Sequence, residues 1–153
     1  MIKLGIIGFS KNNGHPYSFS AIVNGFNEVH FKKVGYPQIL SYLKKKKKKE
    51  FFIKNLKITH AWSEDFKKTT MLCNACKIAN PLKNLNEMIG NVDGVVIARD
   101  DWKSHKKLAS IFLEKKIPVF IDKPLTLSIK DLKYFKKFAD QKLLMSCSAL
   151  RFS

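Results

Sequence analysis

The triplet Asp122-Lys123-Pro124 is the group of residues best suited to chemistry in this sequence. It directly follows residues 118–121, a short apolar run typical of a buried β-strand. Proline restricts the preceding residue to an extended conformation or a cis turn, so the lysine side chain is held in one direction. An ammonium group held there can orient a substrate hydroxyl or polarise a carbonyl group. Lys123 is therefore a candidate catalytic residue and Asp122 and Pro124 are candidate cofactor neighbours, although with 27 lysines in the chain chance alone places a lysine near several strand ends.

A glycine-containing loop follows the first apolar run, residues 2–7, and precedes a stretch with helical spacing that starts at Tyr17. Backbone amides and the helix dipole favour a phosphate at such a position. Gly8 and Gly14 are six positions apart and Ser10 stands between them, so the loop is not a regular G-x-G-x-x-G motif. The loop predicts a phosphate-binding turn, and an ordinary strand-to-helix turn is the alternative.

Two acids come after the predicted second strand, where a dinucleotide-binding fold needs an acceptor for the ribose hydroxyls. Asp65 is in the right place if residues 29–56 are an insertion, and Glu64 is its neighbour and rival. Glu28 has the usual sequence offset but lies in or just past the first predicted helix. An alternative interpretation is that Asp65 and Glu64 complement the dipole at the start of a helix.

Two histidines and two further residues complete the candidate cofactor contacts. His15 lies in the glycine loop, and His105 lies in the first turn of the helix after the fourth predicted strand. Both are candidate cofactor neighbours, although a lone histidine in a turn is often only a polar turn residue. Phe9, in the same loop, and Arg99, directly after the fourth strand, are the other two candidates.

The cysteines indicate neither a redox motif nor a metal site. Cys73 and Cys76 have C-x-x-C spacing, but they fall late in a predicted helix rather than at a helix start. A zinc site needs two more ligands, and Cys147 and the scattered histidines offer no paired spacing. An odd number of cysteines argues against a disulfide framework. We predict a reducing cytoplasm and no metal.

Six short apolar strands alternate with helices along the chain. The predicted strands are residues 2–7, 57–62, 78–79, 92–98, 118–121 and 143–148. The predicted helices are residues 17–26, 39–43, 64–76, 85–89, 102–115 and 128–141. Continuous apolar runs of this kind indicate a doubly wound α/β fold, with a parallel sheet covered by helices on both faces. Ligands in such folds bind beyond the carboxyl ends of the strands, so a residue just after a strand is a better candidate than one at the start of a strand.

The composition is that of one globular domain with an unusual positive charge. The chain has 153 residues, 45% of them hydrophobic, and no apolar run approaches the roughly 20 residues of a membrane span. The formal net charge is +17, but nearly all the basic residues are lysines spread along the chain. Specific nucleic-acid readers use more arginine, so we interpret the lysines as a solvated surface. The alternative is a module that binds nucleic acid or another polyanion through the run at residues 44–49.

Three segments together resemble the N-terminal domain of the Gfo/Idh/MocA (glucose–fructose oxidoreductase / inositol dehydrogenase) family. They are Ile2-Lys3-Leu4-Gly5-Ile6-Ile7-Gly8, Val92-Asp93-Gly94-Val95-Val96-Ile97-Ala98 and Val119-Phe120-Ile121-Asp122-Lys123-Pro124-Leu125. The resemblance implies an NAD(P)-binding Rossmann domain over residues 1–153, with Lys123 as the active-site lysine. It further implies that Gly8, Ser10 and Gly14 follow the pyrophosphate, that Asp65 lies near the adenosine ribose, and that His105 lies near the cofactor. The choice between NAD and NADP stays open.

The resemblance also implies hydride transfer to or from a sugar or polyol. Family members continue into a second α/β domain that contacts the substrate, whereas this sequence ends at Ser153. We therefore expect a truncated form that is incomplete as a catalyst unless a partner chain or a further copy completes it.

Overall fold

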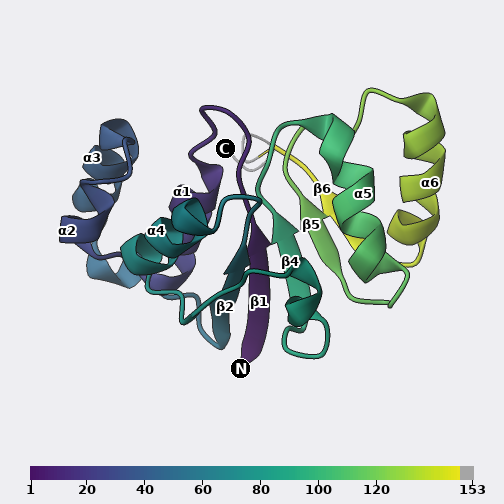
Figure 1. The fold of residues 1–153 in the computed structure, drawn as a ribbon. Helices are drawn as coiled ribbons and strands as arrows, with labels where there is room; N and C mark the ends of the chain where they lie inside the picture. The colour runs from purple at the N-terminus through teal and green to yellow at the C-terminus, as the bar shows by residue number, and fades with distance from the viewer. Residues whose placement is uncertain (149–153) are drawn as a thin grey trace.

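One parallel sheet of six strands organises the chain, and the computed structural model describes residues 1–148 (Figure 1). The order across the sheet is β3-β2-β1-β4-β5-β6. The strands are β1 (Ile2–Ile7), β2 (Leu56–Trp62), β3 (Asn80–Pro81), β4 (Gly94–Ile97), β5 (Val119–Ile121) and β6 (Leu144–Ser146). The chain moves outward from β1 to β3 and then returns to the other side of β1. This reversal places a topological switch point between β1 and β4, and it confirms the predicted doubly wound fold.

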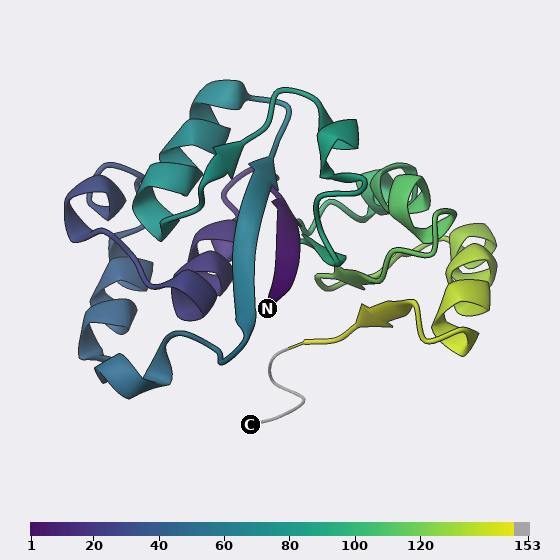
Figure 2. The ribbon, with the colours of Figure 1, turned by 90° about the horizontal axis from the view of Figure 1, so that it is seen from below.

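Helices cover the sheet in two groups. They are α1 (His15–Asn24), α2 (Glu28–Phe31), α3 (Pro37–Lys45), α4 (Phe66–Cys76), α5 (Trp102–Leu113) and α6 (Ile129–Asp140), with short 3-10 turns η1 (Lys48–Glu50) and η2 (Leu85–Met88). Figure 2 shows α1 to α4 gathered beside β1 and β2, and α5 and α6 on the other side of the sheet. Ile6 joins the core under the first group, whereas the next residue, Ile7, joins the core under α5 and α6. Successive strand residues point to opposite faces, so burial on both faces explains why the strands are apolar runs.

Several element boundaries differ from the prediction. The first helix begins at His15 rather than at Tyr17, because Gly14 is its N-cap and proline is well tolerated in a first turn. The third strand is Asn80–Pro81 rather than residues 78–79, because Ile78 is buried in the core and its N–H bonds to Cys73 at the end of α4.

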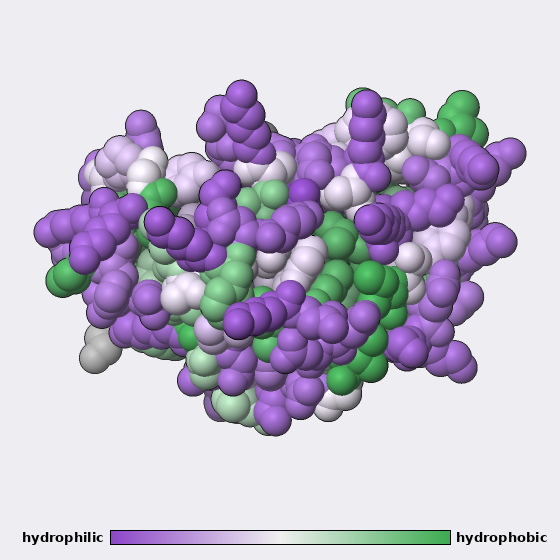
Figure 3. Space-filling view, in the orientation of Figure 1, coloured by the Kyte–Doolittle hydropathy of each residue, from purple (hydrophilic) through white to green (hydrophobic). Residues whose placement is uncertain are grey.

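The lysine-rich segment at residues 29–56 is partly helical and contributes to the core. It holds most of α2, all of α3 and η1, and Phe31, Leu40 and Leu43 are buried against α1 and α4. Within it, Lys44 pairs with Glu28 at 2.9 Å and Lys46 pairs with Glu50 at 3.1 Å. Figure 3 shows that hydrophilic side chains cover most of the visible face of the molecule. The described helices include none that is both long and apolar enough to cross a membrane.

The apolar spacing of residues 128–141 predicts that Leu132, Phe135 and Phe138 all face inward, and this prediction is wrong at one position. Phe135 is fully buried and Phe138 is partly buried, but Leu132 is 52% exposed. The helix touches α5 and β6 along a narrow stripe, so only part of its apolar face is covered.

Phe112 and Leu132 provide a matched test of the core. Replacing the fully buried Phe112 with alanine should lower the free energy of unfolding by about 3–5 kcal/mol, because lost transfer energy adds to a cavity cost. Leu132→Ala, on the exposed side of α6, should change it by less than about 0.5 kcal/mol. Urea denaturation measures both. Equal effects of the two changes would contradict the assigned burial.

Candidate functional site

The carboxyl edge of the sheet brings most of the candidate residues together. Ser10 follows β1, Glu64 follows β2, Arg99 follows β4, and Asp122 and Lys123 follow β5. Parallel strands present their carboxyl ends at one edge, so these side chains share one surface although they are far apart in sequence.

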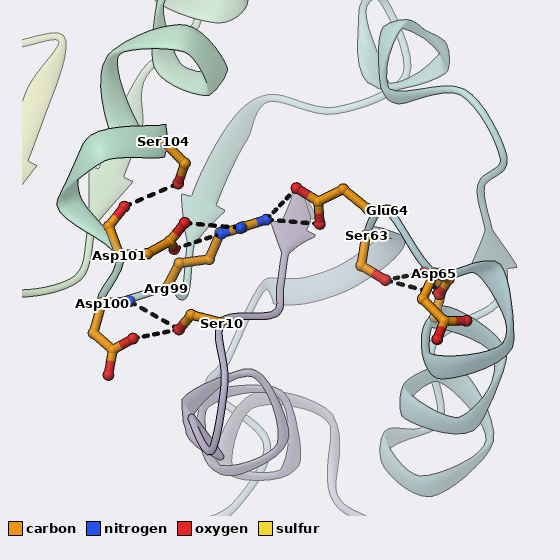
Figure 4. Close-up of polar contacts among 9 residues, drawn as sticks. Ser10, Ser63, Glu64, Asp65, Arg99, Asp100, Asp101 and Ser104 are labelled. Carbon is orange, nitrogen blue, oxygen red and sulfur yellow. Dashed lines mark hydrogen bonds and ion pairs between the residues drawn. The ribbon is translucent and has the colours of Figure 1, made fainter.

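Arg99 links the loop after β4 to the loop after β2, across the end of the intervening β1 (Figure 4). Its Nη1 donates to Glu64 Oε1 and Oε2 at 2.6 and 2.8 Å. Nε and Nη2 donate to Asp101 Oδ1 and Oδ2 at 2.8 and 2.9 Å. The Arg99 side chain is only 8% exposed, whereas the two carboxylates remain partly in water. The forked pair with Asp101 fixes the guanidinium group on its own loop, and the bonds from Nη1 to Glu64 join that loop to the loop after β2.

These ion pairs shift the pKa values of Arg99 and Asp101. Burial lowers the pKa of Arg99, but its hydrogen bonds to Asp101 and Glu64 outweigh burial and leave that pKa raised. Burial raises the pKa of Asp101, but the hydrogen bonds from Arg99 and Ser104 and the positive charge of Arg99 together outweigh burial and leave that pKa lowered. Both shifts favour the charged forms, so the network is an ion-pair network at neutral pH.

Ser10 ties the glycine loop to the same edge. Its hydroxyl donates to Asp100 Oδ1, and the backbone N–H of Asp100 donates to Ser10 Oγ at 3.3 Å. Burial raises the pKa of Asp100, but the side-chain interactions with Ser10 and Asn13 and the positive charge of Lys123 contribute to a net lowering. Lys123 therefore lies close enough to Asp100 for the two charges to interact.

Asn13 places a buried amide donor at the start of α1. Its Oδ1 accepts from the backbone N–H of His15 at 2.7 Å. The residue is 4% exposed, and its Nδ2 makes no hydrogen bond of ordinary geometry within residues 1–148, although it lies near enough to the Asp100 carboxylate to help lower the pKa of that group. A buried donor without a partner carries a desolvation cost that a ligand oxygen would remove. Next to the positive end of a ten-residue helix, this donor fits a phosphate oxygen.

The two loop glycines are required by packing. A Cβ on Gly8 would lie 2.8 Å from Pro16 Cγ, and a Cβ on Gly14 would lie 2.4 Å from Ile39 Cδ1. The glycines thus let α1 approach β1 and let α3 approach the loop. Their predicted place along a pyrophosphate stays a prediction.

A hollow of about 470 Å³ lies beside the glycine loop. Its walls are the loop residues 9–12 together with Tyr17, residues from the segment before α3, and the exposed side of α4. Lys11 and Lys68 are the cations that line it. Phe9, predicted to contact a cofactor, lines this hollow with its ring 5.3 Å from that of Tyr17.

Asp122 is buried next to the exposed Lys123, and its carboxylate stabilises the turn that contains both residues. The Asp122 carboxylate is 4% exposed, and its Oδ1 accepts from the backbone N–H of Lys123 at 2.9 Å. Its Oδ2 bonds to His15 Nδ1. The Lys123-Pro124 peptide bond is cis. The bond between Asp122 and His15 joins the end of β5 to the start of α1.

His105 and Asp65 occupy structural positions in this arrangement. The His105 ring is fully buried, with Nδ1 3.0 Å from the Leu125 carbonyl oxygen and Nε2 3.0 Å from that of Arg99. It therefore braces the loop after β4 against the turn after Lys123. Asp65 is the N-cap of α4, as in the alternative interpretation of the sequence, and its Oδ1 accepts from the N–H groups of Lys67 and Lys68. Direct cofactor contacts by these two side chains stay predictions.

The sequence interpretation did not single out Asn13, Asp100 or Asp101. The two aspartates directly follow the fourth strand, so their position was a usable signal. Asn13 carried no signal, because its importance depends on the burial of its amide group.

The cysteine pair is buried away from the carboxyl edge. Cys73 and Cys76 are free thiols, and burial raises the pKa of Cys73 to about 12 and that of Cys76 further. Within residues 1–148, no group of three histidine, cysteine or acidic side chains is placed to hold a metal ion.

Arg99→Met should lower the free energy of unfolding at pH 7 by about 1–3 kcal/mol, because the charge-assisted bonds to Glu64 and Asp101 are lost. The folded-state pKa of Asp101 lies below its unfolded value, so the stability it contributes is present above the ordinary carboxyl pKa of about 4. That contribution disappears as the pH falls through this value. On acidification, the free energy of unfolding of the variant should therefore fall less than that of wild type. Urea denaturation from pH 7 to pH 3 measures this, with the exposed Lys107→Met as the control. Parallel pH curves for Arg99→Met and wild type would contradict the assignment.

Iodoacetamide at pH 8 should alkylate the partly exposed Cys147 of the native chain much faster than Cys73 or Cys76. A raised pKa leaves little thiolate, and thiolate is the reactive form. In urea all three should react at similar rates. Peptide mass spectrometry resolves the sites, and fast native alkylation of Cys73 would show that the pair is accessible.

Comparisons with known proteins agree with this geometry. A family model described as an oxidoreductase family with an NAD-binding Rossmann fold matches residues 31–148. The structure of apo scyllo-inositol dehydrogenase from Lactobacillus casei at 77 K superposes with a TM-score of 0.67 and 16% identity, covering 100% of this chain and 38% of that one. Myo-inositol 2-dehydrogenase from Lactobacillus plantarum gives a TM-score of 0.67 at 16% identity, with coverages of 99% and 38%.

A second structure of the L. casei enzyme, with bound NAD(H) and scyllo-inositol, gives a TM-score of 0.66 at 17% identity, with coverages of 100% and 38%. At such identities the likeness shows the fold. The chain spans well under half the length of these structural relatives. No curated protein sequence matches significantly.

Proposed function

The chain belongs to the Gfo/Idh/MocA oxidoreductase family, whose model describes an NAD-binding Rossmann fold, and we propose that its carboxyl edge holds NAD for hydride transfer. The observation that carries this proposal is the buried Nδ2 of Asn13 at the start of α1, which makes no hydrogen bond of ordinary geometry within residues 1–148. A buried amide donor and a helix N-terminus together favour an anionic oxygen ligand, and the switch point beside them is where dinucleotides bind in this fold class.

Each part of the site suits one part of the dinucleotide. Asn13 and the N-terminal amides of α1 would bind the pyrophosphate, with Ser10 holding the loop in place. The hollow lined by Phe9 would take the adenosine end. Lys123 and the turn around it would lie at the nicotinamide end, since they follow β5 on the other side of the switch point.

The nicotinamide ring, when bound, supplies hydride chemistry. The residues of this chain would bind and orient the cofactor and the substrate, and would hold charged groups in place. Lys123 would donate a hydrogen bond to the substrate oxygen, and His105 would keep its turn fixed through the contact with Leu125.

We propose a sugar or polyol as substrate. The support is the set of inositol dehydrogenases among the structural relatives, one of which holds scyllo-inositol and NAD(H). These relatives are much longer than this chain, so we also propose that further substrate contacts come from a second domain or a partner chain. Three free thiols support a reducing cytoplasm as the location.

NAD is the cofactor that the loop after β2 favours over NADP. Arg99 fixes the Glu64 carboxylate at that strand end, where it can accept from ribose hydroxyls and would repel a 2′-phosphate. The positive charges of Lys11 and Lys68 in the neighbouring hollow would attract a 2′-phosphate and so favour NADP, but the same charges can bind the pyrophosphate instead.

Fluorescence titration of the full chain with NADH should show saturable binding. Asn13→Asp keeps the oxygen that accepts from the His15 N–H but replaces the N–H₂ donor with a negatively charged acceptor. It should weaken NADH binding by about tenfold or more, the loss of roughly 1.4 kcal/mol that one charge-assisted hydrogen bond represents. Asn91→Asp, an exposed amide, is the control. Absence of saturable binding at millimolar NADH would refute the proposed function.

Glu64→Gln should change cofactor preference rather than fold. Wild type should bind NADH about tenfold or more tightly than NADPH, and the variant should narrow that ratio because the charge that repels a 2′-phosphate is removed. Parallel titrations with both cofactors measure the ratio. Tighter binding of NADPH by wild type would overturn the assignment to NAD.

A further inference from the structure

His15 forms a dyad with a buried carboxylate. It is the first residue of α1, and its Nδ1 bonds to Oδ2 of Asp122, whose side chain is 4% exposed. The imidazole ring stacks on Phe19, with centroids 5.3 Å apart and planes inclined by 22°. These two contacts fix the orientation of the ring, while 37% of the side chain stays exposed at the carboxyl edge.

The dyad determines which ring nitrogen can accept a proton. An ionised carboxylate only accepts hydrogen bonds, so Nδ1 of His15 must donate to Asp122. In the neutral ring Nε2 then carries the lone pair. Within residues 1–148, Nε2 has no hydrogen-bond partner. The same use of a buried aspartate to set a histidine tautomer occurs in the triads of serine proteases.

Lys123 lies in the same turn as Asp122. Asp122 Oδ1 accepts from the backbone N–H of Lys123, so one carboxylate holds both the histidine ring and the lysine turn. The lysine ammonium is a donor only, and its charge interacts with that of Asp100. Oxidation of a hydroxyl group needs a proton acceptor as well, and the free Nε2 of His15 supplies one at this edge.

We propose that His15 exchanges the substrate proton, with Asp122 as its positioning residue; this rests on the proposed function. In the oxidation of a hydroxyl to a carbonyl group, the substrate carbon gives a hydride to the nicotinamide and its O–H proton passes to His15 Nε2. The exposed ring then passes that proton to water. In the reverse direction the protonated ring gives the proton to the carbonyl oxygen as the hydride returns to carbon.

The first test measures the tautomer by ¹⁵N NMR of the histidine side chains of the full chain. Wild-type His15 should carry its proton on Nδ1 when neutral. Asp122→Asn should remove that preference, because an amide no longer presents only acceptors. His30, exposed on α2, is the internal control and should be unaffected. A wild-type His15 with its proton on Nε2 would overturn the proposal.

The second test asks whether the ring lies at the cofactor. Diethyl pyrocarbonate should modify His15, and saturating NAD⁺ should slow that reaction by about tenfold while leaving His30 unchanged; the neutral nitrogen is the reactive site. Cofactor occupancy is followed separately by fluorescence. Saturable NADH binding with no protection of His15 would refute the proton-exchange role and leave the proposed function standing. No cofactor binding at all would refute both.

Discussion

A buried guanidinium group can only be tolerated when carboxylates pair with it, and Arg99 meets this requirement by drawing two loops together. Glu64 comes from the loop after β2 and Asp101 from the loop after β4, on either side of β1. The network therefore fixes the width of the switch point. The glycine loop is held against the same frame through the bond between Ser10 and Asp100.

The two histidines at this edge differ because their surroundings differ. His105 is fully buried between backbone carbonyls, so its ring braces the loops that carry Arg99 and Lys123. His15 is partly exposed, and among the described residues only the Asp122 carboxylate bonds to its ring, which leaves Nε2 available for chemistry. Residue type alone does not distinguish a structural histidine from a reactive one; the number of partners and the exposure do.

The sequence predicted the sheet well, because six apolar runs buried on both faces leave little choice of architecture. It also placed the candidate residues in loops that follow strand ends, and the structure brings most of those loops to one edge of the sheet. It could not predict the partners within the site. His15 and Asp122 are 107 positions apart and Ser10 and Asp100 are 90 apart, and such pairs form only when the sheet brings its strand ends together. The outward position of Leu132 was missed for a related reason, because helical spacing does not reveal how wide a stripe the neighbouring elements cover.

The central claim is that the carboxyl edge is built around a dinucleotide whose phosphates meet Asn13. A crystal structure of the chain grown with NAD⁺ tests this most directly. The account predicts a pyrophosphate oxygen within hydrogen-bond distance of Asn13 Nδ2, and the nicotinamide on the side of Lys123 and His15. A cofactor bound elsewhere, or one that leaves the Asn13 amide without a partner, would contradict it.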